Sequence, residues 1–194
     1  MAHNCDNFDF LLTVDVKTPI METKRGDFVS IMKNKIICTS LDLLREEGLR
    51  FSVDTLAERL KISKKTIYKF FPNKEILALA IYEQYYADVI KQAEQLIGNS
   101  VEPVYSKMLY LYFDSKMMTR IDIFNKYKLN KTVFAYVTKL NDSLWSTISS
   151  AFEGVSSEKE KEAVRLIIDG SFEKLCNTRV CPDAVIERLV TLLC

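Results

Sequence analysis

The sequence has little of what metal and acid–base chemistry require. Its single histidine, His3, lies close to the N-terminus. The five cysteines are an odd number, and none has the Cys-x-x-Cys spacing that is typical of zinc sites and redox motifs. Metal-dependent hydrolysis and Ser-His or Cys-His nucleophiles therefore have almost no side chains to draw on. We expect no catalytic residue, no metal site and no cofactor, and a protein that is not an enzyme.

Long hydrophobic runs are missing as well. No apolar stretch approaches the roughly 20 residues that a membrane-spanning helix needs. The N-terminus lacks the basic start and the long apolar core of a secretory signal. An odd cysteine count without a disulfide framework fits a reducing compartment. These observations predict a cytoplasmic protein with no membrane partner.

Glycine and proline are scarce, at 5 and 4 residues of 194. Hydrophobic residues make up 48% and charged residues 27% of the chain, a balance that excludes a disordered or collagen-like protein. Apolar residues recur at helical spacing over most of the chain, and strand-like alternation is scarce. The sequence therefore predicts an all-α protein. Residues 1–27 are polar and aperiodic, and we set them apart as an N-terminal extension.

The net charge of +1 hides one strongly basic segment. Between residues 59 and 74 the chain carries six bases and no acid: Arg59, Lys61, Lys64, Lys65, Lys69 and Lys74. A basic stripe on an otherwise neutral chain is typical of a local contact with a polyanion. A solvated, lysine-rich helix face is the alternative, and charge alone does not separate the two.

The basic segment coincides with a pattern of two short helices joined by a tight turn. Ser52 is the predicted N-cap of the first short helix, and Ser63 is the predicted N-cap of the second. Asn73 then caps a long helix that runs from Lys74 to about Ile97. With the helix predicted upstream, the ranges are about 28–47, 53–60, 64–71 and 74–97.

Such an arrangement predicts a helix-turn-helix. The second helix is short enough to lie in a major groove, its first turn is polar, and its flanks carry cations and hydroxyls that suit phosphates. An ordinary helical bundle with a basic surface is the alternative interpretation.

The segment also resembles the TetR/AcrR family of bacterial regulators. Its core reads Ser-Lys-x-Thr-Ile-Tyr-x-x-Phe from Ser63 to Phe71, followed by Asn-Lys-Glu from Asn73, and the upstream stretch from Ile36 fits the same family. One departure is Lys61, which stands where the family usually has glycine. If that turn needs a positive φ, a lysine there costs about 1 kcal/mol.

The resemblance implies a double-stranded DNA operator as partner and a set of DNA-binding residues. Ser52 and Ser63, at helix N-termini, would face phosphates, as would Tyr68 and Lys74. Base edges would fall to residues of the second helix, where lysine favours guanine and a threonine methyl can meet thymine. These candidates are Lys64, Lys65, Thr66 and Lys69.

Beyond the long helix, the chain is rich in aromatic residues. Helical spacing predicts further helices near 103–118, 121–129, 131–153, 157–177 and 182–193. In the family this region is a helical domain that binds a small effector in an internal cavity. An aromatic lining suits an apolar or flat ligand, although aromatics at helical spacing also fill ordinary cores. The candidates for a pocket lining are Tyr85, Met108, Tyr112, Phe134 and Trp145.

The last two predicted helices look suited to a partner. The final one is apolar over most of its circumference, which requires cover on two sides. The resemblance supplies a second copy of the chain, because members of the family pair these two helices in a four-helix bundle. The candidate interface residues are Ile167, Gly170, Val185, Ile186, Leu189 and Leu193.

Together these observations give an all-α chain with three parts: an extension (1–27), a helix-turn-helix DNA-binding domain (28–75) and a larger effector-binding and dimerisation domain (76–194). The predicted function is that of a homodimeric repressor released from a palindromic operator by a small, largely apolar or aromatic molecule. The alternative is a DNA-bound protein of the same fold that takes no small effector and acts through protein partners. The direction of regulation stays open.

Overall fold

The computed structural model describes residues 25–47, 52–99, 104–119, 131–152, 157–176 and 180–193. Within these ranges the chain forms eight helices and no strand, so the prediction of an all-α fold is confirmed. The helix predicted over 121–129 and residues 1–20 lie outside the described residues. The helices are α1 (Arg25–Glu47), α2 (Val53–Leu60), α3 (Lys64–Phe70), α4 (Lys74–Asn99), α5 (Tyr105–Met118), α7 (Lys131–Ser149), α8 (Glu158–Cys176) and α9 (Pro182–Leu193).

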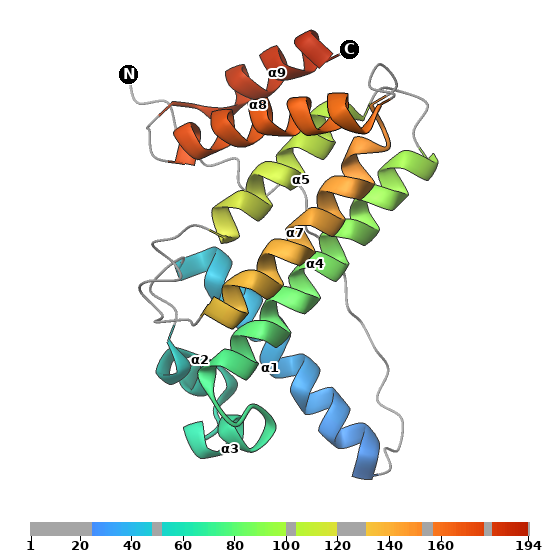
Figure 1. Ribbon diagram of the computed structural model, residues 1–194. Coiled ribbons are helices and arrows are strands. Elements are labelled where there is room, and N and C mark those ends of the chain that lie inside the picture. Colours follow the sequence, from blue (N-terminus) through green and yellow to red (C-terminus); the bar gives the residue numbers. More distant parts are fainter. Residues whose placement is uncertain are drawn as a thin grey trace.

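Helices α1, α2 and α3 pack together at one end of the molecule (Figure 1). Ile36 and Leu43 of α1, Leu56 of α2 and Ile67 of α3 are each fully buried, and Phe71 seals the end of α3. A fully buried aliphatic side chain contributes about 1.5–3 kcal/mol relative to an exposed one. This small core fixes the angle at which α3 meets solvent.

The turn between α2 and α3 depends on a left-handed residue. Lys61 has φ 53° and ψ 41°, and it is the only non-glycine with positive φ in the described part of the chain. Its N–H donates to the carbonyl of Glu58, and the N–H of Ile62 donates to that of Ala57, both at 3.0 Å. This is the hydrogen-bond pattern of a Schellman motif, in which glycine is the favoured residue at the left-handed position. The lysine therefore occupies a strained position, as the sequence comparison with the family suggested.

Replacing Lys61 by glycine is expected to stabilise the protein. The left-handed conformation costs a residue with a side chain about 1–2 kcal/mol, and glycine avoids this cost. Glycine also raises the conformational entropy of the unfolded chain, and this offsets part of the stabilisation. We expect Lys61→Gly to raise the free energy of unfolding by about 0.5–1 kcal/mol in urea denaturation. Lys61→Ala keeps the Cβ and serves as the control. Equal stability of the glycine and alanine variants would contradict the assignment of strain to this turn.

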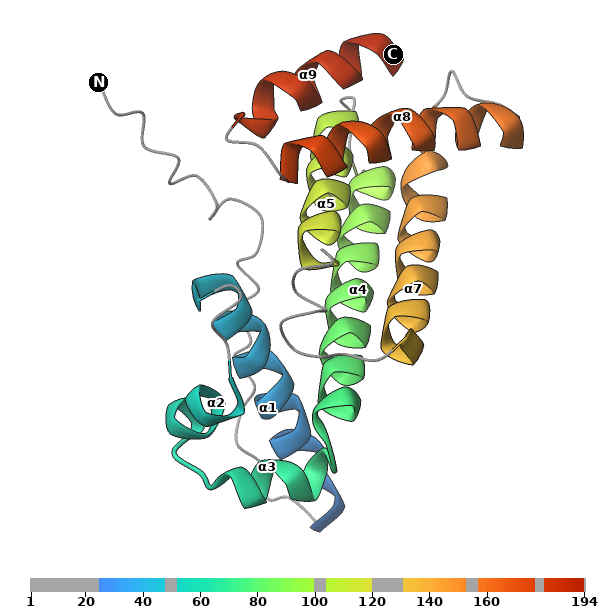
Figure 2. The ribbon, with the colours of Figure 1, turned by 60° about the vertical axis from the view of Figure 1, so that its left-hand side comes forward.

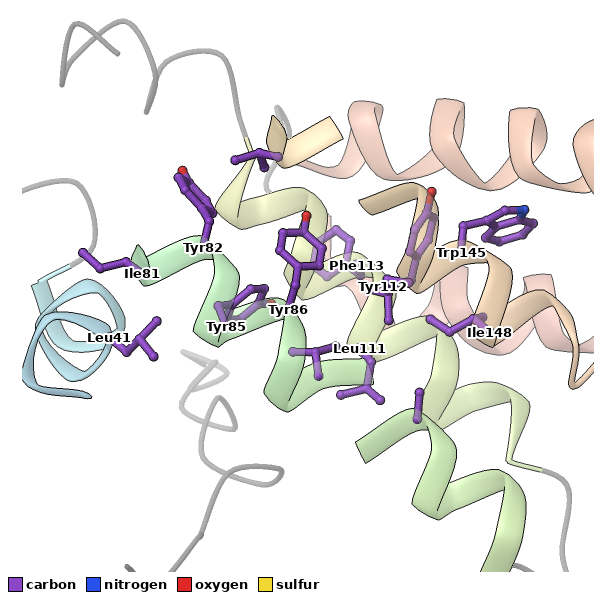
Figure 3. Close-up of a cluster of buried hydrophobic side chains, with 14 of the residues drawn as sticks. Leu41, Ile81, Tyr82, Tyr85, Tyr86, Leu111, Tyr112, Phe113, Trp145 and Ile148 are labelled. Atoms are coloured by element: carbon purple, nitrogen blue, oxygen red, sulfur yellow. The ribbon is translucent and has the colours of Figure 1, made fainter. Parts of the chain in front are cut away.

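Helix α4 joins the two ends of the molecule. Asn73 caps it, since its side-chain oxygen accepts the N–H of Ile76 at 2.9 Å, as predicted. Its first turns pack on α1, where Leu41 lies opposite Ile81 and Tyr85 (Figure 3). Its later turns pack on α5 and α7, and the Tyr82 hydroxyl donates to the carbonyl of Met118 at 2.9 Å. One rigid element thus belongs to both ends.

Helices α5 and α7 run beside α4, and α8 and α9 lie across their far end (Figure 2). The core between them is aromatic. Tyr112 and Phe113 of α5 contact Phe172 of α8, with ring centroids 6.2 and 5.1 Å apart. Tyr112 also lies 5.2 Å from Trp145 of α7. These contacts fix α8 on α5 and α5 on α7.

The aromatic core encloses a polar network. Asn141 of α7 accepts hydrogen bonds from the hydroxyls of Ser115, at 3.0 Å, and Tyr86, at 3.3 Å. Its amide donates to the hydroxyl of Tyr112 at 3.4 Å. All four residues are buried. A satisfied polar network of this kind links α4, α5 and α7 with defined geometry, because breaking one bond leaves a buried polar atom without a partner.

No helix in the described ranges is long and apolar enough to cross a membrane. The same residues contain no group of three or more His, Cys, Asp or Glu side chains placed to hold a metal ion.

Candidate nucleic-acid interface

Helix α3 presents a polar, basic face to solvent. Ile67 is buried beneath it, while Lys64, Lys65, Tyr68 and Lys69 are exposed. Thr66 is half-buried at the edge of this face. The helix lies at the end of the molecule opposite α8 and α9, with no other helix in front of it (Figure 2). The candidates predicted to read DNA are thus brought together on one short exposed helix.

The two predicted capping serines occupy matching positions. The Ser52 hydroxyl accepts the N–H of Thr55, and the Ser63 hydroxyl accepts the N–H of Thr66, both at 3.1 Å. Each hydroxyl also lies 2.9 Å from the threonine hydroxyl of its own helix. The caps hold the remaining N–H groups of both helix N-termini toward solvent, where an anion is favoured.

The fold brings two acids from outside residues 59–74 next to the basic stripe. Arg59 forms a two-point ion pair with Glu46 of α1, at 3.2 and 2.5 Å. Lys64 forms an ion pair with Asp54 of α2. The hydrogen bond to Asp54 raises the pKa of the Lys64 ammonium above its usual range. Two of the six bases are therefore partly neutralised by residues from other helices.

The remaining cations define the electrostatic face. Among the described residues, no acid lies within ion-pair distance of Lys65 or Lys69 on α3, or of Lys61 in the turn. Lys74 is exposed at the first position of α4. Side chains of this kind on a short helix and at its flanks are suited to a phosphate backbone and to base edges.

The predicted pocket residues divide into two groups. Tyr85, Met108, Tyr112 and Trp145 are buried, and Tyr112 and Trp145 pack against each other in the aromatic core (Figure 3). Phe134 lies elsewhere, on the outer side of α7, with 46% of its surface exposed. The structure thus buries four of the five and exposes the fifth.

A polar hollow of about 220 Å³ opens between α7 and α8. Arg165 lies over the Trp145 ring at 5.9 Å and pairs with Asp142 at 2.5 Å. Sequence reasoning named Trp145 but missed the other lining residues, because they come from two helices with no shared motif. The lining consists of Trp145, Ser146, Ser149, Glu158, Lys161, Glu162 and Arg165.

Further charged residues are linked to Arg165. Lys116 pairs with Asp169 at 3.0 Å and lies 5.1 Å from the centre of the Tyr112 ring. Asp169 in turn lies 3.7 Å from Arg165. Burial raises the pKa of the Tyr112 hydroxyl well above its usual range, and Asp169 adds to the effect. Charged side chains therefore lie directly beside the aromatic core.

The predicted interface residues also divide. On α8, Leu166 and Ile167 are 66% and 58% exposed, and Gly170 is exposed beside them. Apart from the neighbouring backbone of α8, no atom of the described residues lies within 4 Å of the place where a side chain would begin on Gly170, so packing among these residues does not require glycine there.

On α9, the structure assigns two of the predicted interface residues to the protomer's own core. Ile186 is fully buried and Leu189 is 6% exposed. Val185 is half-buried, and Leu192 is 66% exposed. Ile186 and Leu189 are apolar because α9 packs on α5 and α8, and their apolar character is already explained without a partner. The Leu193 side chain lies outside the described residues.

Comparisons with known proteins agree on the N-terminal region. A family model described as "Bacterial regulatory proteins, tetR family" matches residues 36–81, from α1 into α4. YvaF, an HTH-type transcriptional regulator of Bacillus subtilis strain 168, is 33% identical over 64 residues. That match covers 33% of this chain and 33% of the relative, so the chain matches only about a third of the length of that protein.

A solved structure extends the likeness to the rest of the fold. The crystal structure of a TetR/AcrR-family transcriptional regulator from Thermobifida fusca superposes with a TM-score of 0.56. The match covers 84% of this chain and 96% of that one, at 19% sequence identity. At this identity the likeness concerns the fold: a helix-turn-helix end followed by a larger helical region.

Proposed function

We propose that this chain is a homodimeric repressor that binds a two-fold-symmetric operator and is released from it by a small molecule. The premise is that the chain belongs to the TetR/AcrR family of transcriptional regulators. The observation that carries the DNA-binding part is the geometry of α3. A short, capped helix anchored by Ile67 exposes Lys65, Tyr68 and Lys69 at one end of the molecule. This is what a reading helix in a major groove requires.

Within that helix, position decides the role that we assign. Lys65, Thr66 and Lys69 would contact base edges, together with Lys64 at the first position of the helix. Ser52, Ser63, Tyr68 and Lys74 would contact phosphates, since they stand at helix ends or on the flank of α3. Residues 28–75 would then act as the DNA-binding domain and residues 76–194 as the effector and dimerisation domain.

The proposed dimer uses the exposed face of α8. Leu166, Ile167 and Gly170 form an apolar, small-residue surface that the protomer leaves uncovered. Exposed leucine and isoleucine side chains side by side are typical of a protein–protein contact. Leu192 and the edge of Val185 on α9 would extend it. A two-fold dimer would present two copies of α3 to successive major grooves.

The proposed effector site is the aromatic core with its polar neighbours. Tyr85, Met108, Tyr112 and Trp145 would supply the apolar wall, and the hollow beside Arg165 would supply the entrance. A flat molecule that carries hydrogen-bonding groups fits this mixture better than a purely apolar one. Phe134 is exposed and is not included.

Fluorescence anisotropy tests the DNA-binding function. The purified protein is titrated with duplex DNA from beside its own gene and with random DNA over a series of salt concentrations. Binding to the neighbouring DNA is expected to be about 10³-fold tighter or more, and to weaken steeply as salt rises. Weak binding that is equal for both DNAs at all salt concentrations would argue against an operator at that location.

Two substitutions on α3 are expected to differ in kind. Lys65→Ala should weaken operator binding by about 1–3 kcal/mol and relax the preference at one base pair, because a base contact carries sequence information. Tyr68→Phe should weaken all DNA sequences about equally, because a phosphate contact does not. Binding to an operator and to its single-base variants measures both effects. A sequence-selective loss in Tyr68→Phe, or no change in Lys65→Ala, would contradict the assigned roles.

One observation favours the alternative in which no effector is bound. Tyr112 and Trp145 pack against each other at 5.2 Å and against Phe172 and Phe152, so these predicted pocket residues serve each other as core. A protein of this kind would act on DNA through protein partners. A screen of flat, polar molecules for changes in operator affinity separates the two functions.

A further inference from the structure

Asp54 and Lys64 form an ion pair across the helix-turn-helix, between the first turn of α2 and the first residue of α3. Both side chains lie at the surface, 62% and 53% exposed. The two residues are ten positions apart, on either side of the left-handed turn at Lys61. The pair therefore exists only because the motif is folded.

Helix dipoles explain why the pair has this polarity. An acid in the first turn of a helix is favourable, and Asp54 occupies that position in α2. A cation at a helix N-terminus is unfavourable, and Lys64 occupies that position in α3. The carboxylate of Asp54 offsets the repulsion and directs the ammonium of Lys64 toward α2.

The same position matters for DNA. The first turn of a reading helix lies closest to the base edges, whereas a long lysine side chain at that place also reaches the nearest phosphate. A lysine free to swing would bind a phosphate on any sequence and add affinity without information. A lysine held by Asp54 is less able to make that contact.

We propose that Asp54 is a positioning residue for sequence specificity: it holds the ammonium of Lys64 toward α2 and so limits the contact that Lys64 makes with the phosphate backbone on random DNA. The inference rests on the proposed DNA-binding function of α3. Asp54 itself would place a negative charge near the DNA phosphates, and this charge further disfavours phosphate contact by Lys64 on random DNA. Because the pair is exposed, it is weak enough to adjust when α3 enters a groove.

The test is the salt dependence of binding to random-sequence duplex DNA by the full-length protein. In Asp54→Asn, Lys64 is released, and each protomer on the DNA gains one phosphate contact. The slope of log K against log salt should steepen by about 0.9 per protomer. Affinity for random DNA should rise about 3–10-fold at low salt. Affinity for an operator selected from a random pool should rise less, so the ratio of specific to random binding falls.

Two variants make the result specific to the pair. Glu58→Gln removes one exposed acid from the same helix, and Glu58 forms no ion pair with a described residue. It should leave the slope unchanged. In a Lys64→Ala background, Asp54→Asn should no longer change the slope. A thermal melt of each variant checks that the fold is intact.

An unchanged slope in Asp54→Asn would overturn the inference, as would an equal change in Glu58→Gln or in the Lys64→Ala background. These outcomes are distinguishable from failure of the proposed function. If the proposed DNA-binding function were wrong, the wild-type protein itself would show no salt-dependent binding to DNA.

Discussion

A variant that carries both Leu166→Glu and Ile167→Glu is expected to be a folded monomer that has lost nearly all of its operator affinity. The two side chains are 66% and 58% exposed, so the protomer does not need them for its own core. In the proposed two-fold dimer, each glutamate would meet the apolar surface of the partner and the glutamates of the partner. Linking two half-site contacts contributes about 10²–10⁴-fold in apparent affinity, and that factor is lost in the monomer.

Sedimentation and anisotropy on the same samples measure both parts of this expectation. The matched control is Leu189→Glu on α9. Leu189 is 6% exposed inside the protomer, so a charge there should unfold or precipitate the protein and not give a soluble monomer. A double variant on α8 that remains a dimer, with unchanged DNA binding, would mean that the interface lies on another surface.

A second large effect is expected on the pH dependence of stability, and it concerns Asp114, a half-buried residue of α5. Burial raises the pKa of its carboxyl from the usual 3.8 to about 6. The folded state therefore binds this proton more tightly than the unfolded chain does. The stability that Asp114 contributes is fully present below about pH 4 and is lost as pH rises through about 6. Above that pH the ionised carboxylate costs the folded state up to about 3 kcal/mol.

Asp114→Asn is expected to remove that cost. At pH 7.5 the variant should be about 1–3 kcal/mol more stable than the wild type, and the difference should shrink as the pH falls toward 4. Urea denaturation at several pH values measures it. Glu94→Gln, at an exposed position of α4, controls for the loss of one negative charge. A pH-independent difference would show that burial of the charge is not the cause.

Local features of the fold were predictable because they depend on neighbours in the chain. The caps at Ser52, Ser63 and Asn73 follow from short polar side chains placed before helical patterns, and the structure has each of them. The strain at Lys61 followed from a single expected glycine. The boundaries of α2 and α3 were predictable for the same reason: the signals lie within a few residues.

Features that depend on distant residues were not predictable in this way. The basic stripe reads as acid-free in sequence, yet Glu46 and Asp54 reach Arg59 and Lys64 from other helices. The apolar surface of α9 suggested a partner, whereas α5 and α8 already cover Ile186 and Leu189. Periodicity gives the face of a helix but not the identity of what lies against it.

The candidate effector region shows the same limit. Sequence composition singled out aromatic residues, and four of the five predicted are buried. The fifth, Phe134, is on the outer side of α7, because helical phase near a helix end is poorly fixed by spacing alone. The polar network around Asn141 combines side chains from three helices, and the hollow beside Arg165 combines side chains from two. No local sequence pattern predicts either of them.

The single helix α4 carries a geometric consequence for regulation. At 1.5 Å per residue, its 26 residues make a rod about 39 Å long. A tilt of only about 5° about one end moves the other end by about 3 Å, which is close to the rise of one base pair along a DNA strand. In the proposed dimer, such a tilt would put the two copies of α3 out of step with successive grooves. The proposed release from DNA would then require a small rotation of a stiff helix and no hinge.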